Sequence, residues 1–299
     1  MTDSSQHRPN RPYVDPVIER LCAASRAQYT NPYTAFEWQE ALDPELWCMK
    51  PELVSLAGTS IYERLSEAQK RKLSFYEIVN FFSLTLHGEQ MFISKLVPFL
   101  YRKPYAHLTE YMQHFLDEEV KHIVCFGDFC VRYAGKVYPD LHVAAGSAEY
   151  ARGESELAFF TSVLIFEEMG NYYNVELARD PRLNPIVREI NAYHRREEAR
   201  HRVFGRQVVQ SLFAKYRAGW TADELDKIRE YLAAFIMATW KEYFNPAVYD
   251  DAGLEDSYSL YEQALESAEA RARFERVTAD ISSFLVENEI LLAPPTYAL

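Results

Sequence analysis

The chain has 299 residues, of which 48% are hydrophobic and 14% aromatic, enough for a sizeable core in one large domain or two ordinary ones. Its formal charge is −12, from 32 Lys and Arg against 44 Asp and Glu, without a basic cluster, which argues against nucleic acid as the main partner. Residues 1–12 carry no signal-peptide core and no apolar run approaches the ~18–20 residues of a membrane span, so we expect a soluble, cytoplasmic protein without a membrane partner.

Apolar residues recur at helical spacing along most of the chain, and alternating strand patterns are scarce. The pattern predicts three short helices, around 15–28, 51–57 and 66–72. Four long helices are predicted next, near 74–101, 106–136, 151–179 and 183–217. Two more are predicted near 221–244 and 259–289, the first opened by a capping box from Thr221 to Glu224.

The chain shows no linker long or polar enough to divide it into domains. We therefore expect a single all-α domain at 13–293, with residues 1–12 and 294–299 as frayed or extended tails. No Gly-x-Gly occurs, which excludes the usual dinucleotide fingerprint and a phosphate-binding P-loop. The four cysteines form no Cys-x-x-Cys pair, and we expect them to be small buried hydrophobes.

Two segments of the sequence repeat one motif. Residues 117–122 read Asp-Glu-Glu-Val-Lys-His and residues 196–201 read Arg-Glu-Glu-Ala-Arg-His, so each contains Glu-x-x-His. A further glutamate precedes each motif in an apolar stretch: Glu89 lies 30 residues before Glu119, and Glu167 lies 31 before Glu198. Because positions i and i+3 share a helix face, each motif presents a carboxylate and an imidazole together.

The four long helices each carry one part of this set: Glu89, then Glu119 with His122, then Glu167, then Glu198 with His201. One glutamate from each of two helices plus Glu-x-x-His from each of the other two is the ligand set of a carboxylate-bridged dimetal site in a four-helix bundle. A single Glu-x-x-His is common as a solvated pair, but the duplicated arrangement is specific. The sequence therefore predicts a metalloenzyme.

We expect Glu119 and Glu198 to bridge the two metals, with Glu89 and Glu167 as terminal ligands and one of His122 and His201 on each metal. Two divalent ions would balance the four carboxylates, so the metal-free protein should be less stable. Carboxylate and imidazole ligands suit Fe, Mn or Zn.

A third histidine shares this helix face, because His194, Glu198 and His201 lie at i, i+4 and i+7. The first motif has no counterpart, since Phe115 occupies the corresponding position. His194 is either a seventh ligand or a residue that supports the site from the core, and its position alone does not choose between them.

With these residues, the chain resembles the AurF-type non-haem di-iron N-oxygenases, which convert arylamines to hydroxylamino and nitro compounds. The resemblance rests on Glu89, the Glu119 and His122 pair, Glu167 and the stripe from His194 to His201, and covers most of residues 35–240. The lead-in from Pro51 through Gly58-Thr59 to Leu65-Ser66-Glu67 also fits. The resemblance implies a ferritin-like bundle with additional N- and C-terminal helices, His194 as a ligand, and Glu167 rather than Glu168 as the third-helix ligand.

The resemblance also implies a mechanism. A diferrous pair would bind O2 and form a peroxo-diferric species that transfers oxygen to the lone pair of an amine, with His194 tuning that species. Glu119, Glu198 and His194 are thus the expected catalytic residues, in a protein of specialised metabolism. Electrons would come from an external reductase or small reductant, and a homodimer is plausible.

Residues beside the proposed ligands have other expected roles. Glu118, Glu168 and Glu197 point about 100° away from their neighbours and are expected to be solvated or to orient an imidazole, as Asp117 could. His87, His107, His114 and His142 are expected to be non-ligands. Tyr172, Tyr173 and Tyr193 are expected mostly as core aromatics. Lys121, Arg195 and Arg202 are expected to leave the metal face, so no residue is identified that would bind a substrate carboxylate.

Other functions remain open at this point. The same scaffold could hydroxylate, desaturate or cleave a carbon substrate. Ferroxidase or iron storage is a different class, disfavoured because a ferritin-like bundle needs only four helices. A structural bundle without turnover is a third class.

Overall fold

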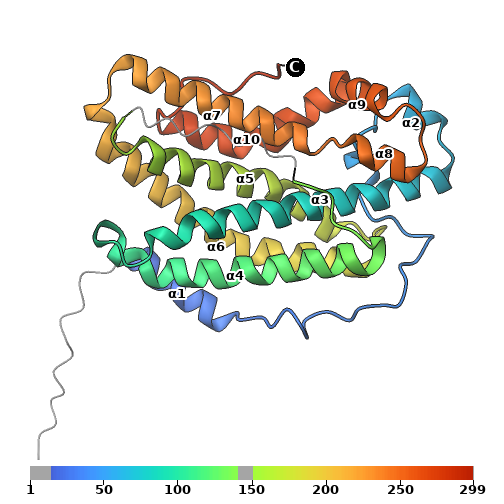
Figure 1. Cartoon of the computed structure of the whole chain (residues 1–299), viewed down its shortest axis with the longest axis horizontal. Helices are drawn as coiled ribbons and strands as arrows, with labels where there is room; N and C mark the ends of the chain where they lie inside the picture. The colour runs from blue at the N-terminus through green and yellow to red at the C-terminus, as the bar shows by residue number, and fades with distance from the viewer. Residues whose placement is uncertain (1–14, 141–150, 299) are drawn as a thin grey trace, which may run out of the picture.

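Four long helices form the centre of the molecule, in a computed structural model that describes residues 15–140 and 151–298. They are α3 (Glu67–Leu96), α4 (Thr109–Phe129), α5 (Glu154–Arg179) and α6 (Pro185–Tyr216). α3 packs along α4, and α5 packs along α6, while further contacts join α3 to α5 and α4 to α6 (Figure 1). The described ranges contain helices and no strand, which confirms the all-α prediction.

Additional helices cover this bundle, as the sequence predicted. α1 (Pro16–Ala27) packs against α4 and α6, whereas α7 (Ala222–Glu242) and α10 (Ala268–Glu287) pack against α5 (Figure 1). α8 (Pro246–Ala252) packs on α3 and on α9 (Ser257–Glu266), and α2 (Ser60–Arg64) precedes α3. Short turns complete the chain: η1 (Pro51–Leu53), η2 (Val97–Phe99), η3 (Lys103–Leu108), the π turn η4 (Cys130–Ala134) and η5 (Arg217–Gly219).

Several helix predictions were wrong, among them the helix expected at 51–57, where the η1 turn (Pro51–Leu53) forms instead. The helices expected at 66–72 and 74–101 are one helix, α3, because the hydroxyl of Ser74 is satisfied within it by the carbonyl of Arg71 at 2.8 Å. The single helix expected at 259–289 is divided at Ser267, whose side chain accepts from the amide of Ala270 and caps α10. α8 was not predicted, although Asn245 caps it and Pro246 opens it.

Local capping explains the boundaries that were predicted well. α7 begins at the expected capping box, in which the Thr221 hydroxyl and the Glu224 carboxylate each accept from the other residue's backbone amide. The predicted tail at residues 1–12 lies outside the described residues. The other predicted tail has no regular structure up to residue 298, but Tyr297 packs on Phe274 with ring centroids 5.4 Å apart.

A close approach of α3 and α5 fixes the spacing of the bundle. A Cβ atom placed on Gly88 would lie 2.5 Å from the ring of Phe166, so a larger residue there would require that ring to shift. Gly88 and Phe166 immediately precede Glu89 and Glu167, and this contact therefore sets how closely those two carboxylates approach. All four cysteines are buried and free, as expected. No helix among the described residues has the length and apolar character needed to cross a membrane.

Candidate metal centre

The bundle brings together all seven residues that the sequence predicted as ligands. They come from the four long helices, and none is more than 6% exposed: Glu89 on α3, Glu119 and His122 on α4, Glu167 on α5, and His194, Glu198 and His201 on α6. Seven ionisable side chains thus meet in the interior of one bundle. Such a burial of charge needs compensation from cations or protons.

Their potential ligand atoms form two adjacent groups. Within each group these atoms lie within 4.8 Å of one another. The first group is Glu89, His122, His194 and Glu198, and the second is Glu119, Glu167, Glu198 and His201. The arrangement fits two metal positions, one of which would carry two imidazoles and the other one.

Glu198 and Glu119 lie between the two groups. The Oε1 atom of Glu198 is 3.3 Å from His122 Nδ1, 3.0 Å from His194 Nε2 and 3.2 Å from His201 Nδ1. The two oxygens of Glu119 divide between the groups, with Oε2 at 2.9 Å from His122 Nδ1 and Oε1 at 3.0 Å from His201 Nδ1. Both carboxylates therefore contact histidines of both groups.

The polar atoms that face this centre meet the chemical requirements of a metal pair. Atoms from six of the residues are buried without a hydrogen-bond partner among the described residues: Glu89 Oε2, Glu119 Oε1, Glu167 Oε1, both Glu198 oxygens, His194 Nε2 and His201 Nδ1. Buried polar atoms of a native protein are nearly always paired. Lone pairs from carboxylates and imidazoles that converge without protein partners fit two divalent cations.

Proton affinities in the metal-free protein support this fit. Burial and the nearby Glu119 raise the pKa of Glu89 well above its ordinary value. Burial would lower the pKa of His122, but its contacts with Glu119 and Glu197 raise it to about 9. The pKa of His201 is also raised well above its ordinary value, because Glu198 and Glu119 outweigh burial. Protons are thus drawn to the positions that cations would neutralise.

The outer nitrogens of two imidazoles are held by the glutamates that precede the bridging pair. His122 Nε2 lies 3.1 Å from Glu197 Oε2 on α6, and His201 Nε2 lies 2.8 Å from Glu118 Oε2 on α4. Each motif therefore supplies a carboxylate to the histidine of the other motif. This contact fixes the imidazole so that Nδ1 faces the centre and raises its basicity as a ligand.

Arg200 connects these two glutamates, and the sequence analysis missed it. Its guanidinium donates to Glu118 at 2.7 Å and lies 3.6 Å from Glu197. Burial opposes ionisation of Glu118, but the hydrogen bonds from His201 and Arg200 lower its pKa to about 2. Arg200 lies between the two glutamates because the two motifs pair across the bundle. The spacing of residues in the sequence does not reveal this pairing.

His194 is placed in the first group by contacts at both ring nitrogens. Nε2 lies 3.4 Å from Glu89 Oε1 and 3.0 Å from Glu198 Oε1, and Nδ1 lies 2.8 Å from the side-chain amide of Asn174 on α5. Burial and the neighbouring His122 hold the pKa of His194 well below its ordinary value, so the ring is neutral. The side-chain nitrogen of Asn174 lies against Nδ1, and this contact holds the ring with Nε2 facing Glu89 and Glu198. Asn174 was not anticipated from the sequence.

Other charged residues near the motifs point away from the centre. Glu168 pairs with Arg202 at 3.1 Å and with Arg206 at 2.6 Å. Asp117, proposed above as a support for an imidazole, pairs instead with Lys121 at 2.5 Å and is half-exposed. Lys121 and Arg202 thus leave the metal face, as expected.

The remaining histidines that the structure describes lie outside the seven-residue centre. His87 Nε2 lies 2.7 Å from the carbonyl of Tyr138, and His107 is exposed. His114 lies near Cys22 and Glu110, but the carboxylate of Glu110 is taken by an ion pair with Arg26 at 2.6 Å. His142 lies outside the described residues.

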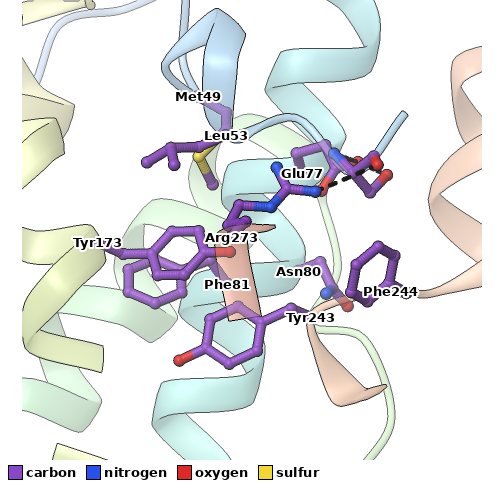
Figure 2. Close-up of a pocket in the computed structure, with 10 residues that line it drawn as sticks. Met49, Leu53, Glu77, Asn80, Phe81, Tyr173, Tyr243, Phe244 and Arg273 are labelled. Atoms are coloured by element: carbon purple, nitrogen blue, oxygen red, sulfur yellow. Dashed lines mark hydrogen bonds between the residues drawn. The ribbon is translucent and has the colours of Figure 1, made fainter. Parts of the chain in front are cut away.

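One of the tyrosines singled out above lies beside the site, and another lines a separate cavity. The ring of Tyr193 packs edge-on against His122, with centroids 5.7 Å apart. Tyr173 lines a small buried cavity together with Arg273, Glu77 and Tyr243, which Figure 2 shows. A second cavity borders Glu167 and His201 directly and is otherwise apolar in its described lining.

The sequence and the fold of the chain are similar to those of known proteins. The family model described as P-aminobenzoate N-oxygenase AurF matches residues 11–289. Two uncharacterized mycobacterial proteins, Mb0909 of Mycobacterium bovis and Rv0885 of Mycobacterium tuberculosis, are each 24% identical over 208 residues, or 66% of this chain and 61% of theirs. The match thus spans about three fifths of the length of these relatives.

Solved structures show the same fold. Two variants of an R2-like ligand-binding oxidase with an aerobically reconstituted Mn/Fe cofactor align with a TM-score of 0.52 at 15% identity. The alignments cover 93% of this chain and 93% or 94% of those chains. The predicted resemblance covered residues 35–240, whereas the family model extends nearly to both ends of the chain. The chain therefore belongs to the AurF family of non-haem di-iron oxygenases.

Proposed function

We propose that the seven residues hold two metal ions and that the chain uses them to oxidise the nitrogen of a small-molecule amine, most simply an arylamine. The amine, O2, two electrons and two protons would give the hydroxylamine and water, so one oxygen atom ends on nitrogen and the other leaves as water. Repeated oxidation would give the nitroso or nitro product. The electrons come from an external reductase or a small reductant.

The metal pair supplies the activation of O2, for which amino-acid side chains have no equivalent. Carboxylate and imidazole ligands suit two iron ions, and manganese in one position is chemically compatible. Glu119 and Glu198 are the proposed bridges, Glu89 and Glu167 the terminal carboxylates, and His122, His194 and His201 the imidazole ligands.

The protein's own contribution is a fixed and dry site. Glu118, Glu197 and Asn174 hold the three imidazoles at their outer nitrogens, so the ligands need little reorganisation when metal binds. The ring of Phe115 lies 4.0 Å from that of His201 and closes the site on that side. Exclusion of water prevents reducing equivalents and reactive oxygen from being lost to solvent.

The observation that carries the proposal is the position of His194. Its Nε2 approaches the same Glu198 oxygen as the other two imidazoles, and it is buried without a hydrogen-bond partner among the described residues. A third imidazole makes the first metal position richer in nitrogen than a symmetrical pair of Glu-x-x-His motifs would. Membership of the AurF family supports amine oxidation as its use.

The test is a single-turnover experiment. Protein loaded anaerobically with Fe(II) is analysed for iron, mixed with O2, and followed by visible absorption with and without an arylamine. We expect two irons per chain and a transient absorption that decays faster with amine, together with hydroxylamino or nitro product. A transient that is indifferent to every amine would contradict N-oxygenation, and oxidised carbon products would favour the alternative of a di-iron oxygenase or desaturase acting on carbon.

A cytoplasmic location is part of this proposal. Four free, buried cysteines fit a reducing compartment, where reductases and small reductants are present.

A further inference from the structure

A second set of metal-binding side chains meets where α1 packs on α4. It consists of Cys22 on α1 and of Glu110 and His114 on α4, and one potential ligand atom of each lies within 4.8 Å of the others. We propose that these three residues bind one zinc ion, which fastens α1 to the bundle. The site shares no residue with the centre that the proposed amine oxidation uses.

The packing of two helices brings the three side chains together. Glu110 and His114 lie at i and i+4 of α4 and therefore share one helix face. α1 packs on α4 (Figure 1), and Cys22 is 2% exposed on the buried side of α1. Glu110 is exposed and His114 half-buried, so a cation could reach the thiol from the solvent side.

The donor set is the kind that zinc prefers, with one sulfur, one imidazole nitrogen and one carboxylate oxygen. Zinc bonds of about 2.0–2.3 Å place the ligand atoms of a tetrahedral site about 3.5 Å apart, so the three side chains would close by roughly one ångström. Glu110 and His114 can make this movement because they are not fully buried. A thiolate and a carboxylate also balance the charge of Zn²⁺, and water would complete the coordination.

Two of the three side chains are available to a metal. His114 makes no hydrogen bond, ion pair or ring contact with another described residue. Burial, and then the nearby Glu110, raise the pKa of the Cys22 thiol to about 11, so the thiol keeps its proton when no metal is bound. Zinc would replace this proton on sulfur and release it to solvent, because thiolates are the form that binds metal.

The third ligand is shared with an arginine. Arg26 donates to Glu110 Oε1 at 2.6 Å, and the two side chains are 54% and 62% exposed. An exposed ion pair of this kind contributes little to stability, so a divalent cation can displace the guanidinium. Arg26 is thus a competitor of the metal, and its removal should strengthen metal binding.

Fastening α1 would also steady a contact of the seven-residue centre. Gln28 ends α1, and its side-chain oxygen accepts from Arg200 at 2.8 Å. Arg200 in turn donates to Glu118, the carboxylate behind His201. Zinc between α1 and α4 would therefore limit the movement of the helix that holds Arg200 from outside the bundle.

The experiment uses Co(II), which takes the place of zinc and gives a thiolate-to-cobalt charge-transfer band when sulfur is a ligand. The seven-residue centre has oxygen and nitrogen donors only, so it cannot give this band. Iron-loaded protein is titrated anaerobically with Co(II), and Zn(II) is then added. We expect a band that saturates at one Co(II) per chain and disappears with Zn(II). Absence of the band, or a band that Zn(II) does not remove, would overturn the proposal.

Cysteine and histidine variants locate the site. Cys22→Ser should abolish the band, whereas the control Cys125→Ser should keep it, because Cys125 is equally buried but belongs to no group of potential ligands among the described residues. His114→Gln should weaken Co(II) binding at least about tenfold, since loss of even an outer contact of a ligand has this effect. It also decides the question if Cys22→Ser does not fold. A band that survives in Cys22→Ser, or unchanged affinity in His114→Gln, would refute the site.

A pair of arginine variants tests Glu110. Arg26→Gln frees the carboxylate, whereas the control Arg20→Gln removes the same charge from an exposed position of the same helix. We expect Co(II) to bind up to about fivefold more tightly to Arg26→Gln than to Arg20→Gln, which is the strength of an exposed ion pair. Equal or weaker binding by Arg26→Gln would contradict metal binding by Glu110.

Discussion

The glutamates that support the imidazoles give the sharpest test of the metal centre. Three Glu-Glu pairs occur at the site, and in each pair one member faces the metals: Glu119 after Glu118, Glu198 after Glu197, and Glu167 before Glu168. Glu118 and Glu197 contact imidazoles at 2.8 and 3.1 Å, whereas Glu168 contacts only arginines among the described residues. Substitution of each by glutamine keeps the shape and removes the charge.

We expect Glu118→Gln to weaken metal binding by about 10–100-fold, the usual effect of losing a carboxylate behind a histidine ligand. That range corresponds to about 1.4–2.7 kcal/mol. Glu197→Gln should lie at the lower end, because its imidazole contact is longer and Arg200 is 3.6 Å away instead of 2.7 Å. Glu168→Gln should leave metal affinity unchanged.

The assay is a competition titration in which a chelator of known affinity and the protein share a limiting supply of Fe(II) or Zn(II). Thermal unfolding of each metal-free variant serves as the control for damage to the fold. Equal losses of metal affinity in the Glu118 and Glu168 variants would refute the reasoning, because they would show that general loss of buried charge, and not imidazole support, determines affinity.

Further predictions concern the bridges, the third imidazole, metal removal and pH. Glu119→Ala or Glu198→Ala should remove metal and activity together, and two metals retained by elemental analysis would contradict bridging. His194→Ala should keep some metal but change the rate of O2 reaction by about tenfold or more, measured by stopped flow; unchanged metal content, kinetics and product would exclude a ligand role. Chelation should destabilise the fold by about 2.7 kcal/mol relative to protein in free metal at about 100 times Kd, measured by thermal unfolding, and an unchanged melting temperature would contradict a native-only site. Burial raises the pKa of Glu77 to about 7 despite hydrogen bonds from Ser55 and the nearby Arg273. The contribution of Glu77 to stability is therefore present below about pH 4.5 and is lost as pH rises to about 7. Glu77→Gln should flatten this part of the curve of unfolding free energy against pH.

Much of the centre could be predicted because its ligand spacing is local. Glu119 with His122, and His194 with Glu198 and His201, share a helix face whatever the helix packs against. The long helices were also predictable, since their apolar periodicity and capping residues act over a few positions. The helix boundaries near Ser74 and Ser267 were not predictable in this way. They depended on which backbone groups form hydrogen bonds with these two hydroxyls.

The tertiary structure decided what lies between helices. The exchange of Glu118 and Glu197 between the two histidines, the support of His194 by Asn174, and the position of Arg200 each join residues of different helices. The rotation and spacing of packed helices set these contacts, and the close approach at Gly88 is one determinant that sequence periodicity does not encode. The sequence by itself thus determined which residues could bind metal, and only the packing decided how they are supported and how apolar the adjoining cavity is.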